Sequence, residues 1–193
     1  MAYLNSNLPK DSIVTNGAGN YATWIHRFYH FRAYGTQLAP TSGTMGYGLP
    51  AAIAAKELYP NKVVVCFAGD GDFMMTGEEF ATAVQYQIPL IVVVVDNGMY
   101  GTIRMHQEQH YPKRVVGTAL RNPNFAEYAR AFGGRGESVA TIEEFIAAWE
   151  GAIVADRPTI IHCHIDPEAI TPTLTLSQIR ELALERLAKE GQG

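Results

Sequence analysis

Short apolar runs alternate with longer amphipathic stretches along most of the chain. Val63–Ala68 and Leu90–Val95 are rich in β-branched residues and lack polar alternation, which is typical of parallel strands that helices cover on both faces. Thr159–Ile165 is a third strand candidate, and weaker ones span Ser12–Thr15 and Gly136–Val139. The pattern therefore predicts a mainly parallel sheet with a buried centre.

The stretches between these runs predict helices. Thr76 and Glu79 have the spacing of a capping box that opens a helix ending near Gln87, and Thr141 and Glu144 repeat this device. An apolar stripe at helical spacing follows the second box and predicts the buried face of that helix. The stripe consists of Ile142, Phe145, Ile146, Trp149 and Ile153.

Another helix start is marked by Asn122, the predicted N-cap, and by Pro123 at the first helical position. Three more amphipathic segments predict helices over residues 21–31, 47–58 and 176–189. Because strands and helices alternate, we expect an α/β layered fold with right-handed crossovers.

Composition sets the size of the unit and its surface. The 193 residues suit one domain, and no Ser-, Gly- or Pro-rich linker divides them, so residues 1–193 are predicted to form a single domain. Hydrophobic residues make up 47% of the chain, which is enough for an ordinary core. Only 18% of the residues are charged, against roughly 25% in typical soluble domains, so some apolar surface is expected to face a partner.

The charge limits the classes of partner that the protein can bind, and the cysteines indicate its cellular compartment. The net charge is −4 without any basic block, which argues against a nucleic-acid binder. The longest apolar stretch, Ile88–Val95, contains Pro89 and is too short to span a membrane, so no membrane partner is expected. Cys66 and Cys163 lie in apolar runs and are expected to be buried free thiols of a cytoplasmic protein.

Two glycine-containing turns follow the two most apolar strands. In the first, Gly69 and Gly71 allow a tight turn around Asp70, whose carboxylate is a hard oxygen donor. In the second, Asp96 and Asn97 follow 24 residues after Gly71, which is room for one helix and one strand. Each turn alone is compatible with a plain strand-to-helix connection.

Together the two turns predict a ligand site. If the crossover is one βαβ unit, both turns lie at the carboxyl ends of neighbouring parallel strands, where open α/β sheets bind ligands. Asp70 and Asn97 would then offer two oxygens to one cation. Mg²⁺ takes about six oxygens and often accepts several from phosphates and water, so the residues themselves suggest a Mg²⁺–diphosphate site.

These residues resemble the cofactor fingerprint of thiamine diphosphate (ThDP) enzymes, and the similarity extends from about Leu4 to Glu181. Thr41–Ala52 resembles their segment at the aminopyrimidine–thiazolium junction, and Asn16–Asn20 resembles a loop that touches the diphosphate. The most similar group is the acetolactate synthase-like enzymes. The resemblance implies their C-terminal ThDP-binding domain, with a three-layer α/β/α fold.

The resemblance also implies roles for individual residues. Asp70 and the side-chain oxygen of Asn97 would be Mg²⁺ ligands, with the backbone carbonyl of Met99 as the third. The amides of Gly71 and Asp72 would donate to the diphosphate, although many relatives carry serine where this chain has Asp72. That carboxylate would repel the phosphate unless it faces away or caps the following helix.

The remaining implied roles concern the organic part of the cofactor. The Gly43 carbonyl would accept from the pyrimidine amino group, and Met45 would be the wedge that bends ThDP, with a core methionine as the alternative. The complete cofactor-binding set implied by the resemblance is Gly19, Asn20, Gly43, Thr44, Met45, Gly69, Asp70, Gly71, Asp72, Asn97, Met99 and Tyr100.

The histidines leave alternatives open. His106 stands where acetohydroxy acid synthases carry a tryptophan, so it either touches substrate or lies on the surface. His162 and His164 alternate on a strand and could share a face, but we expect no third metal ligand nearby and hence no metal there. His26 and His30 lie in an aromatic-rich helix, whose aromatic face either joins the core or packs on another domain.

One part of the chemistry is expected to come from elsewhere. ThDP enzymes of this family take an activating glutamate from an N-terminal pyrimidine-binding domain, and we find no such domain in this sequence. We therefore assign no catalytic residue to this chain. We expect a half-site that needs a pyrimidine-binding domain or subunit in a homo- or hetero-oligomer, either as a fragment or as the smaller subunit of a split enzyme.

The resemblance implies that the complete enzyme is a 2-oxo acid decarboxylase or carboligase acting on a small 2-oxo acid, a lyase or a transferase. Two alternatives remain. The chain could be a non-catalytic module that binds ThDP or another diphosphate for sensing or assembly. A nucleotide-binding α/β domain is disfavoured, because neither Gly-x-Gly-x-x-Gly after the first strand nor a phosphate-loop Gly-Lys-Ser/Thr is present.

Overall fold

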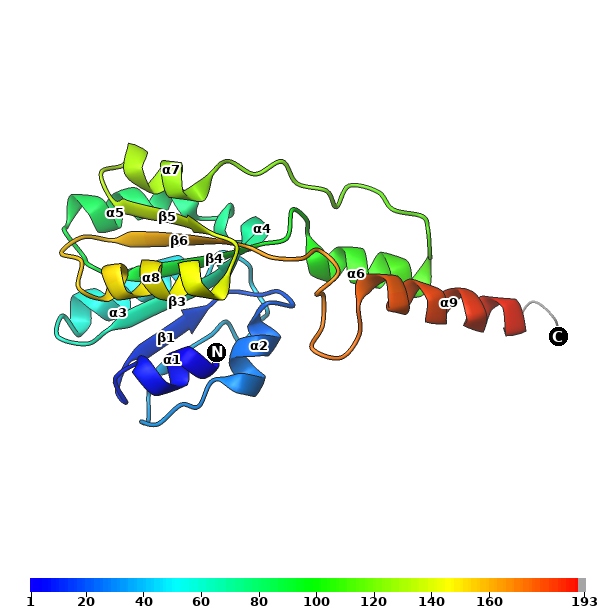
Figure 1. The fold of residues 1–193 in the computed structure, drawn as a ribbon, viewed down its shortest axis with the longest axis horizontal. Helices are drawn as coiled ribbons and strands as arrows, with labels where there is room; N and C mark the ends of the chain where they lie inside the picture. Colours follow the sequence, from blue (N-terminus) through cyan, green and yellow to red (C-terminus); the bar gives the residue numbers. More distant parts are fainter. Residues whose placement is uncertain (191–193) are drawn as a thin grey trace.

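Six parallel strands form the central sheet of the computed structural model, which describes residues 1–190 (Figure 1). The strand order is β2-β1-β3-β4-β6-β5. The predicted domain over residues 1–193 includes residues 191–193, which lie outside the described residues. The strands are β1 (Ile13–Asn16), β2 (Gln37–Leu38), β3 (Val64–Gly69), β4 (Ile91–Asp96), β5 (Arg135–Val139) and β6 (Thr159–His164).

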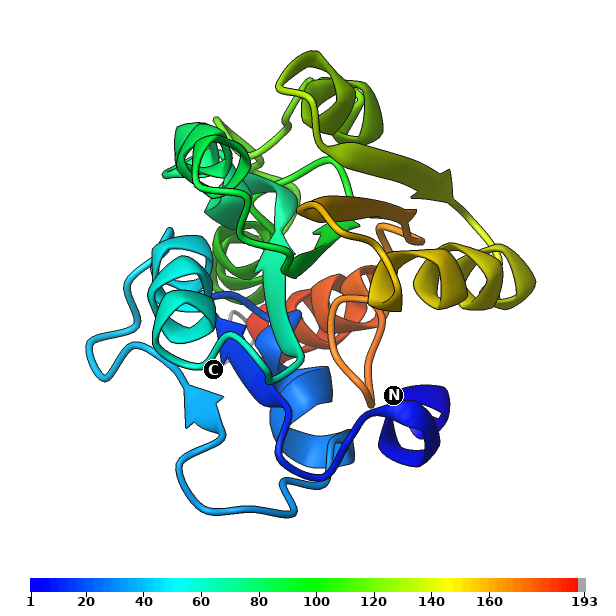
Figure 2. The ribbon, with the colours of Figure 1, turned by 90° about the vertical axis from the view of Figure 1, so that its left-hand side faces the viewer.

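Helices cover both faces of the sheet, which confirms the predicted three-layer α/β/α fold (Figure 2). One layer consists of α1 (Ala2–Asn7), α2 (Ala22–Phe28) and α8 (Ile142–Ile153), and the other of α3 (Gly48–Leu58), α5 (Phe80–Gln85) and α7 (Phe125–Ala131). The remaining helical segments are α4 (Asp70–Phe73), the 3₁₀ helix η1 (Gly77–Glu79), α6 (Gly101–His110) and α9 (Leu176–Glu190). No helix of residues 1–190 has the length and apolar character needed to cross a bilayer.

Alternation along the strands divides the core into two clusters. In β3, Cys66 and Ala68 face α3 and α5, whereas Val65 and Phe67 face α2 and α8, because successive side chains of a strand point to opposite faces. All six β3 residues are buried, as the absence of polar alternation predicted. The largest side chains of the two clusters are Phe73, Phe80 and Phe125 on one face and Trp149 and Tyr29 on the other.

The order of the strands creates a crevice at their carboxyl ends. From β1 the chain crosses to β2 on one side, whereas from β3 it crosses to β4 on the other side. The connections that follow β1 and β3 therefore leave in opposite directions. Open α/β sheets bind ligands in the crevice at such a point.

Helices α6 and α9 lie outside the three layers and run side by side beyond the carboxyl ends of the strands (Figure 1). We call these two helices the arm. A small cluster of Ile170, Leu176 and Ile179 supports it. The carboxylate of Glu108 on α6, which is 1% exposed, accepts hydrogen bonds from Arg104 and from Arg180 of α9.

The two predicted capping boxes have different outcomes. The box at Thr141 and Glu144 is confirmed at the start of α8. The box at Thr76 and Glu79 is wrong: the Thr76 hydroxyl donates to the Gly46 carbonyl at 2.7 Å and caps no helix. The segment from Gly77 begins as η1 before α5 starts, because Thr76 is held by a contact with a distant loop.

The N-cap predicted at Asn122 is also wrong. Helix α7 begins at Phe125, and Asn124 is its cap, accepting from the amides of Ala126 and Glu127. The side chain of Asn122 is instead used in the site described below.

Smaller differences concern short or exposed segments. Strand β2 has only two residues and was not predicted, because so short a pattern carries no periodic signal. Within the predicted α8 stripe, Trp149 is buried but Ile142 is 56% exposed. Cys66 is buried as expected, whereas Cys163 is only partly buried, and both thiols are free. Burial raises the pKa of each thiol to about 12.

Candidate functional site

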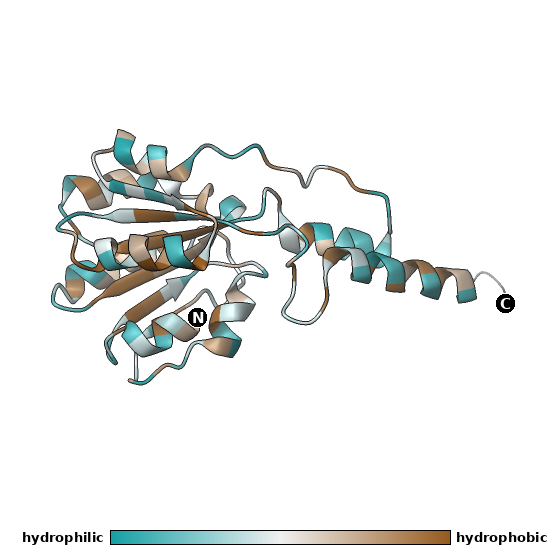
Figure 3. Cartoon of the chain, in the orientation of Figure 1, coloured by the Kyte–Doolittle hydropathy of each residue, from teal (hydrophilic) through white to brown (hydrophobic). Residues whose placement is uncertain are grey.

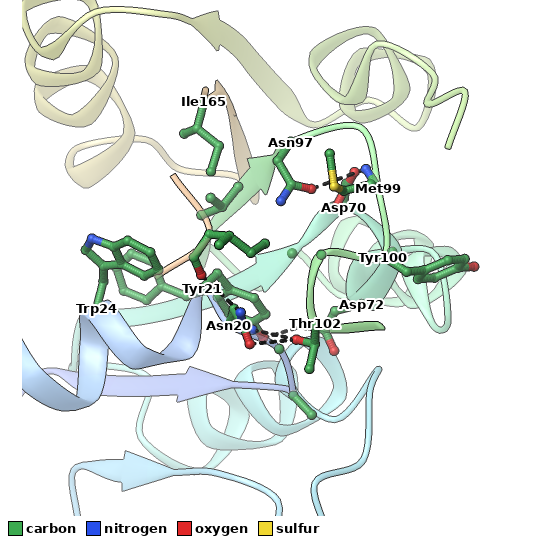
Figure 4. Close-up of a pocket in the computed structure, with 18 of the residues that line it drawn as sticks. Asn20, Tyr21, Trp24, Asp70, Asp72, Asn97, Met99, Tyr100, Thr102 and Ile165 are labelled. Carbon is green, nitrogen blue, oxygen red and sulfur yellow. Dashed lines mark hydrogen bonds between the residues drawn. The ribbon is translucent and has the colours of Figure 1, made fainter. Parts of the chain in front are cut away.

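A cavity of about 340 Å³ opens at the carboxyl ends of β1, β3 and β4 (Figure 4). Of the cofactor-binding set implied by the sequence, all residues except Gly43 and Thr44 line it. Asp70 and Asn97, which come from different strands, therefore face the same space, as the predicted cation site requires. Residues that line the cavity without having been predicted include Tyr21, Trp24, Thr102, Ile165 and Ile170.

The turn after β4 is held in shape by a distant segment of backbone. The Tyr100 amide donates to the Thr118 carbonyl at 2.9 Å, and the Leu120 amide donates to the Gly98 carbonyl at 2.8 Å. Gly98 has a φ of +70°, a conformation that favours glycine. The side-chain oxygen of Asn97 accepts from the Met99 amide at 3.2 Å, so its position in the turn is defined.

The donor set of this corner fits a hard divalent cation. It contains the carboxylate of Asp70, which is 3% exposed, and the amide oxygen of Asn97. Both atoms are oxygens of the kind that Mg²⁺ prefers, and the cavity leaves space for phosphate and water oxygens.

Asn122 links Asp70 to a second carboxylate, that of Asp96. Asn122 donates one side-chain N–H to Asp70 at 2.7 Å and the other to Asp96 at 2.8 Å. Burial, together with the nearby Asp96, raises the pKa of Asp70 to about 6. Burial also opposes ionisation of Asp96, but hydrogen bonds from His162 and the Gly98 amide outweigh it and lower the pKa of Asp96 to about 2.

From the sequence we expected no third metal ligand near His162 and His164, but Asp96 lies beside them. Asp96 and the two histidines place ligand atoms within 4.8 Å of one another, which corrects that expectation. However, Nδ1 of His162 accepts from the Phe125 amide at 3.2 Å, so the neutral ring carries its proton on Nε2. That nitrogen lies 2.8 Å from Asp96, and His162 is therefore a hydrogen-bond donor to Asp96 in this arrangement.

The carboxylate of Asp72, which also lines the cavity, has both oxygens engaged by protein donors. Its two oxygens accept from the Gly46 amide and from the Tyr21 hydroxyl, each at 2.7 Å. A Cβ on Gly17 would lie 2.0 Å from this carboxylate, so a larger residue there would displace the Asp72 side chain. Burial raises the pKa of Asp72 above its usual value, and the hydrogen bonds from these donors offset only part of the rise. Asp72 therefore joins three loops around the cavity.

Asn20 connects the sheet to the arm (Figure 4). Its side-chain oxygen accepts from the Thr102 hydroxyl at 2.9 Å, and its NH₂ group donates to the Ile170 carbonyl at 3.0 Å. The same hydroxyl accepts from the Asn20 amide at 3.0 Å. Asn20 lines the cavity as predicted, but its side chain is already used to join two walls.

Several candidate residues lie apart from the cavity. Gly43 and Thr44 belong to an exposed loop, with only Met45 of that segment reaching the lining. His106 is exposed and stacks on His110 with ring centroids 6.0 Å apart. His26 and His30 are exposed, and α2 ends before His30, so the buried part of that segment is formed by other residues.

Comparisons with known proteins identify the family of the chain. The family model described as "Thiamine pyrophosphate enzyme, C-terminal TPP binding domain" matches residues 17–163. Acetolactate synthase isozyme 2 large subunit of Escherichia coli (strain K12) is 34% identical over 188 residues, covering 96% of this chain and 34% of that protein. Acetolactate synthase large subunit of Pyropia yezoensis is 31% identical over 162 residues, covering 83% of this chain and 28% of that protein.

A solved structure shows the same architecture. The thiamine diphosphate-dependent 4-hydroxybenzoylformate decarboxylase of Rhodococcus jostii RHA1 superposes with a TM-score of 0.80 at 30% identity, covering 86% of this chain and 31% of that chain. The present chain thus spans about a third of the length of these relatives.

Proposed function

Since the chain belongs to the thiamine pyrophosphate enzymes, as a C-terminal TPP-binding domain of the acetolactate synthase-like kind, we propose that it binds Mg²⁺–ThDP and contributes this half-site to a decarboxylase or carboligase of small 2-oxo acids. The observation that carries the proposal is the meeting of Asp70 and Asn97 in one cavity at the end of β3 and β4. A carboxylate and an amide oxygen there suit the cation that a diphosphate brings with it.

The chain's own residues would hold the cofactor and keep water from part of it. Asp70, Asn97 and the Met99 carbonyl would bind Mg²⁺, and the amides of Gly71 and Asp72 would bind the diphosphate. Met45 would contact the organic part of the cofactor from the cavity lining, and Gly43 and Thr44 would reach it from the exposed loop that precedes Met45. When bound, ThDP supplies the electron sink for breaking the bond to the carboxylate of a 2-oxo acid, and the protein supplies orientation and charge.

The activating group is proposed to come from outside this chain. Among the described residues, the carboxylates that line the cavity are Asp70 and Asp72. Asp70 is needed for the cation, and Asp72 is already bound to Tyr21 and Gly46. We therefore propose that a pyrimidine-binding domain or subunit supplies a glutamate in a homo- or hetero-oligomer. The greater length of the relatives supports this assembly. The free thiols support a cytoplasmic setting.

Melting of the chain with ThDP and Mg²⁺ tests the cofactor part of the proposal. Because the proposed site holds the diphosphate through Mg²⁺, ThDP is expected to raise the melting temperature only when Mg²⁺ is present. A ligand that binds only the folded state stabilises it by about 2.7 kcal/mol at 100 times its Kd. Asp70→Asn should abolish most of the shift. An equal shift with EDTA present, or with Mg²⁺–ATP in place of ThDP, would contradict the proposal.

Activity tests the remaining part. The isolated chain with Mg²⁺–ThDP should release no CO₂ from 2-oxo acids, and addition of a pyrimidine-binding partner should restore turnover. Turnover by the chain alone would refute the half-site. Cofactor binding without turnover in any complete assembly would instead favour a non-catalytic sensing or assembly module.

A further inference from the structure

The side chain of Asn122 joins the two turns that carry the cation ligands, and we propose that it is a positioning residue for that site. The inference rests on the proposed function and deepens it. Asn122 lies 52 residues from Asp70 and 26 from Asp96 in the sequence, yet its amide nitrogen is within 2.7 Å and 2.8 Å of their carboxylates. A primary amide has two N–H donors, so both are used in this bridge.

The sheet sets the backbone spacing at the ends of β3 and β4, where Gly69 pairs with Val95, and the bridge fixes the side chains of Asp70 and Asp96 that follow this pair. Asp70 is the first residue after β3, and Asp96 is the last residue of β4, directly before Asn97. Asp96 also accepts from the Gly98 amide at 2.8 Å, so the carboxylate that Asn122 grips is part of the Asn97 turn itself. Loss of Asn122 would therefore leave the two strand ends paired but release the Asp70 side chain from its orientation beside the Asn97 turn.

The far end of the bridge is anchored in the core. His162 is 2% exposed and donates to the second oxygen of Asp96, while the Phe125 amide fixes the ring from its other nitrogen. The result is a continuous series of hydrogen bonds from the backbone of α7 through His162, Asp96 and Asn122 to Asp70. Each group in the series has a defined donor or acceptor role.

The bridge also orients the Asp70 carboxylate. Asn122 donates to Oδ2 of Asp70, and the carboxylate, which can accept about four hydrogen bonds, keeps capacity that would serve a cation. Without the amide, the two buried carboxylates would face each other with neither of its two N–H donors between them, and like charges would push Asp70 from its place. Groups that orient a ligand in this way typically change metal affinity about 10-fold to 100-fold when removed.

The test compares Asn122→Ala with Asn124→Ala in the full chain. Asn124 lies two residues further along the same segment and caps α7 through the amides of Ala126 and Glu127, but it touches neither carboxylate. Mn²⁺ affinity in the presence of ThDP is measured by electron paramagnetic resonance, well below the melting temperature of each variant. This readout does not depend on turnover.

Asn122→Ala is expected to weaken Mn²⁺ binding about 10-fold or more, whereas Asn124→Ala should lower the melting temperature and leave the affinity within about 2-fold of wild type. Asn122→Ser, which keeps one donor, should give an intermediate loss and serves if the alanine variant does not fold. Equal losses in the Asn122 and Asn124 variants, or unchanged affinity in Asn122→Ala, would overturn the inference alone. Failure of the wild-type chain to bind Mn²⁺ with ThDP would overturn the proposed function and this inference together.

Discussion

The layered sheet and the start of α6 in the arm both line the cavity, but the sheet and the arm are held in different ways. The sheet lies between two apolar clusters, and its central strands are buried on both faces. Most residues of the arm are hydrophilic (Figure 3), and the arm depends on a three-residue apolar cluster and on the buried carboxylate of Glu108. The comparison indicates that the strands that carry the cation corner are fixed by core packing, whereas the arm depends on a few directional contacts.

The largest expected effect comes from breaking the packed side of this comparison. Trp149→Ala removes a side chain that is 1% exposed, and large-to-small changes of buried aromatic residues cost about 3–5 kcal/mol. Because the core supports every strand, chemical denaturation should show the whole chain losing stability together. Ile142→Ala on the same helix, at a position 56% exposed, should cost less than about 0.5 kcal/mol. Similar losses in both variants would contradict this account.

A smaller and local loss is expected when the arm is broken. Glu108→Ala removes the carboxylate that Arg104 and Arg180 share. Loss of a buried pair can cost about 3–5 kcal/mol, but the two arginine side chains are 20% and 26% exposed and can be hydrated, so we expect about 1–3 kcal/mol.

Hydrogen exchange distinguishes the arm from the sheet in that variant. Amides of α6 and α9 should lose protection while those of β3 and β4 keep theirs, because local opening does not require global unfolding. Glu190→Ala removes an exposed pair with Arg186 and should change protection by less than about 0.5 kcal/mol. Loss of protection in the strands would show that the arm is not a separate unit of stability.

Acid should weaken the arm by the same mechanism. Hydrogen bonds from Arg180, with smaller help from the Lys113 amide and Arg104, lower the pKa of Glu108 to about 2. Since the unfolded pKa is about 4.3, this stabilisation is complete above that pH and is lost as the pH falls from about 4.3 to about 2. Exchange in α6 and α9 should therefore rise over this range in wild type. Glu108→Gln should show a smaller change, and identical profiles would exclude Glu108 as the cause.

The sequence predicted the central strands of the sheet and the helix over residues 176–189 that forms α9, but not the packing of α9 against α6, because the two kinds of feature depend on different information. Strands β3 and β4 follow from local runs of apolar residues, and the turns after them follow from glycines next to oxygen donors. The pairing of Glu108 with Arg180 joins residues 72 apart, and no local pattern indicates it. The cavity was predicted where its residues lie in short motifs, and missed where single side chains such as Trp24 and Ile165 reach it from other elements.

Polar residues near the turns show the same limit more sharply. Thr76 and Asn122 have side chains that cap helices in local sequence contexts, and their neighbours supported that interpretation. In the structure each makes a tertiary hydrogen bond instead, Thr76 to Gly46 and Asn122 to Asp70 and Asp96. The residue types are the same in both uses, so only the arrangement in space distinguishes a cap from a support of the site.

The smallest expected effect lies at the contact between the two regions. Thr102→Val keeps the shape of the side chain but removes the hydroxyl that donates to Asn20 at 2.9 Å, a loss of about 0.5–1.5 kcal/mol. Thr82→Val is the matched control, since its hydroxyl donates to Glu79 at 2.9 Å on α5, away from the arm. Both variants should lose similar global stability, but only Thr102→Val should also speed exchange in α6 and weaken ThDP binding. Equal ThDP affinity in the two variants would mean that the arm does not help to shape the cavity, and the contrast between a packed wall and a hydrogen-bonded wall would then concern stability alone.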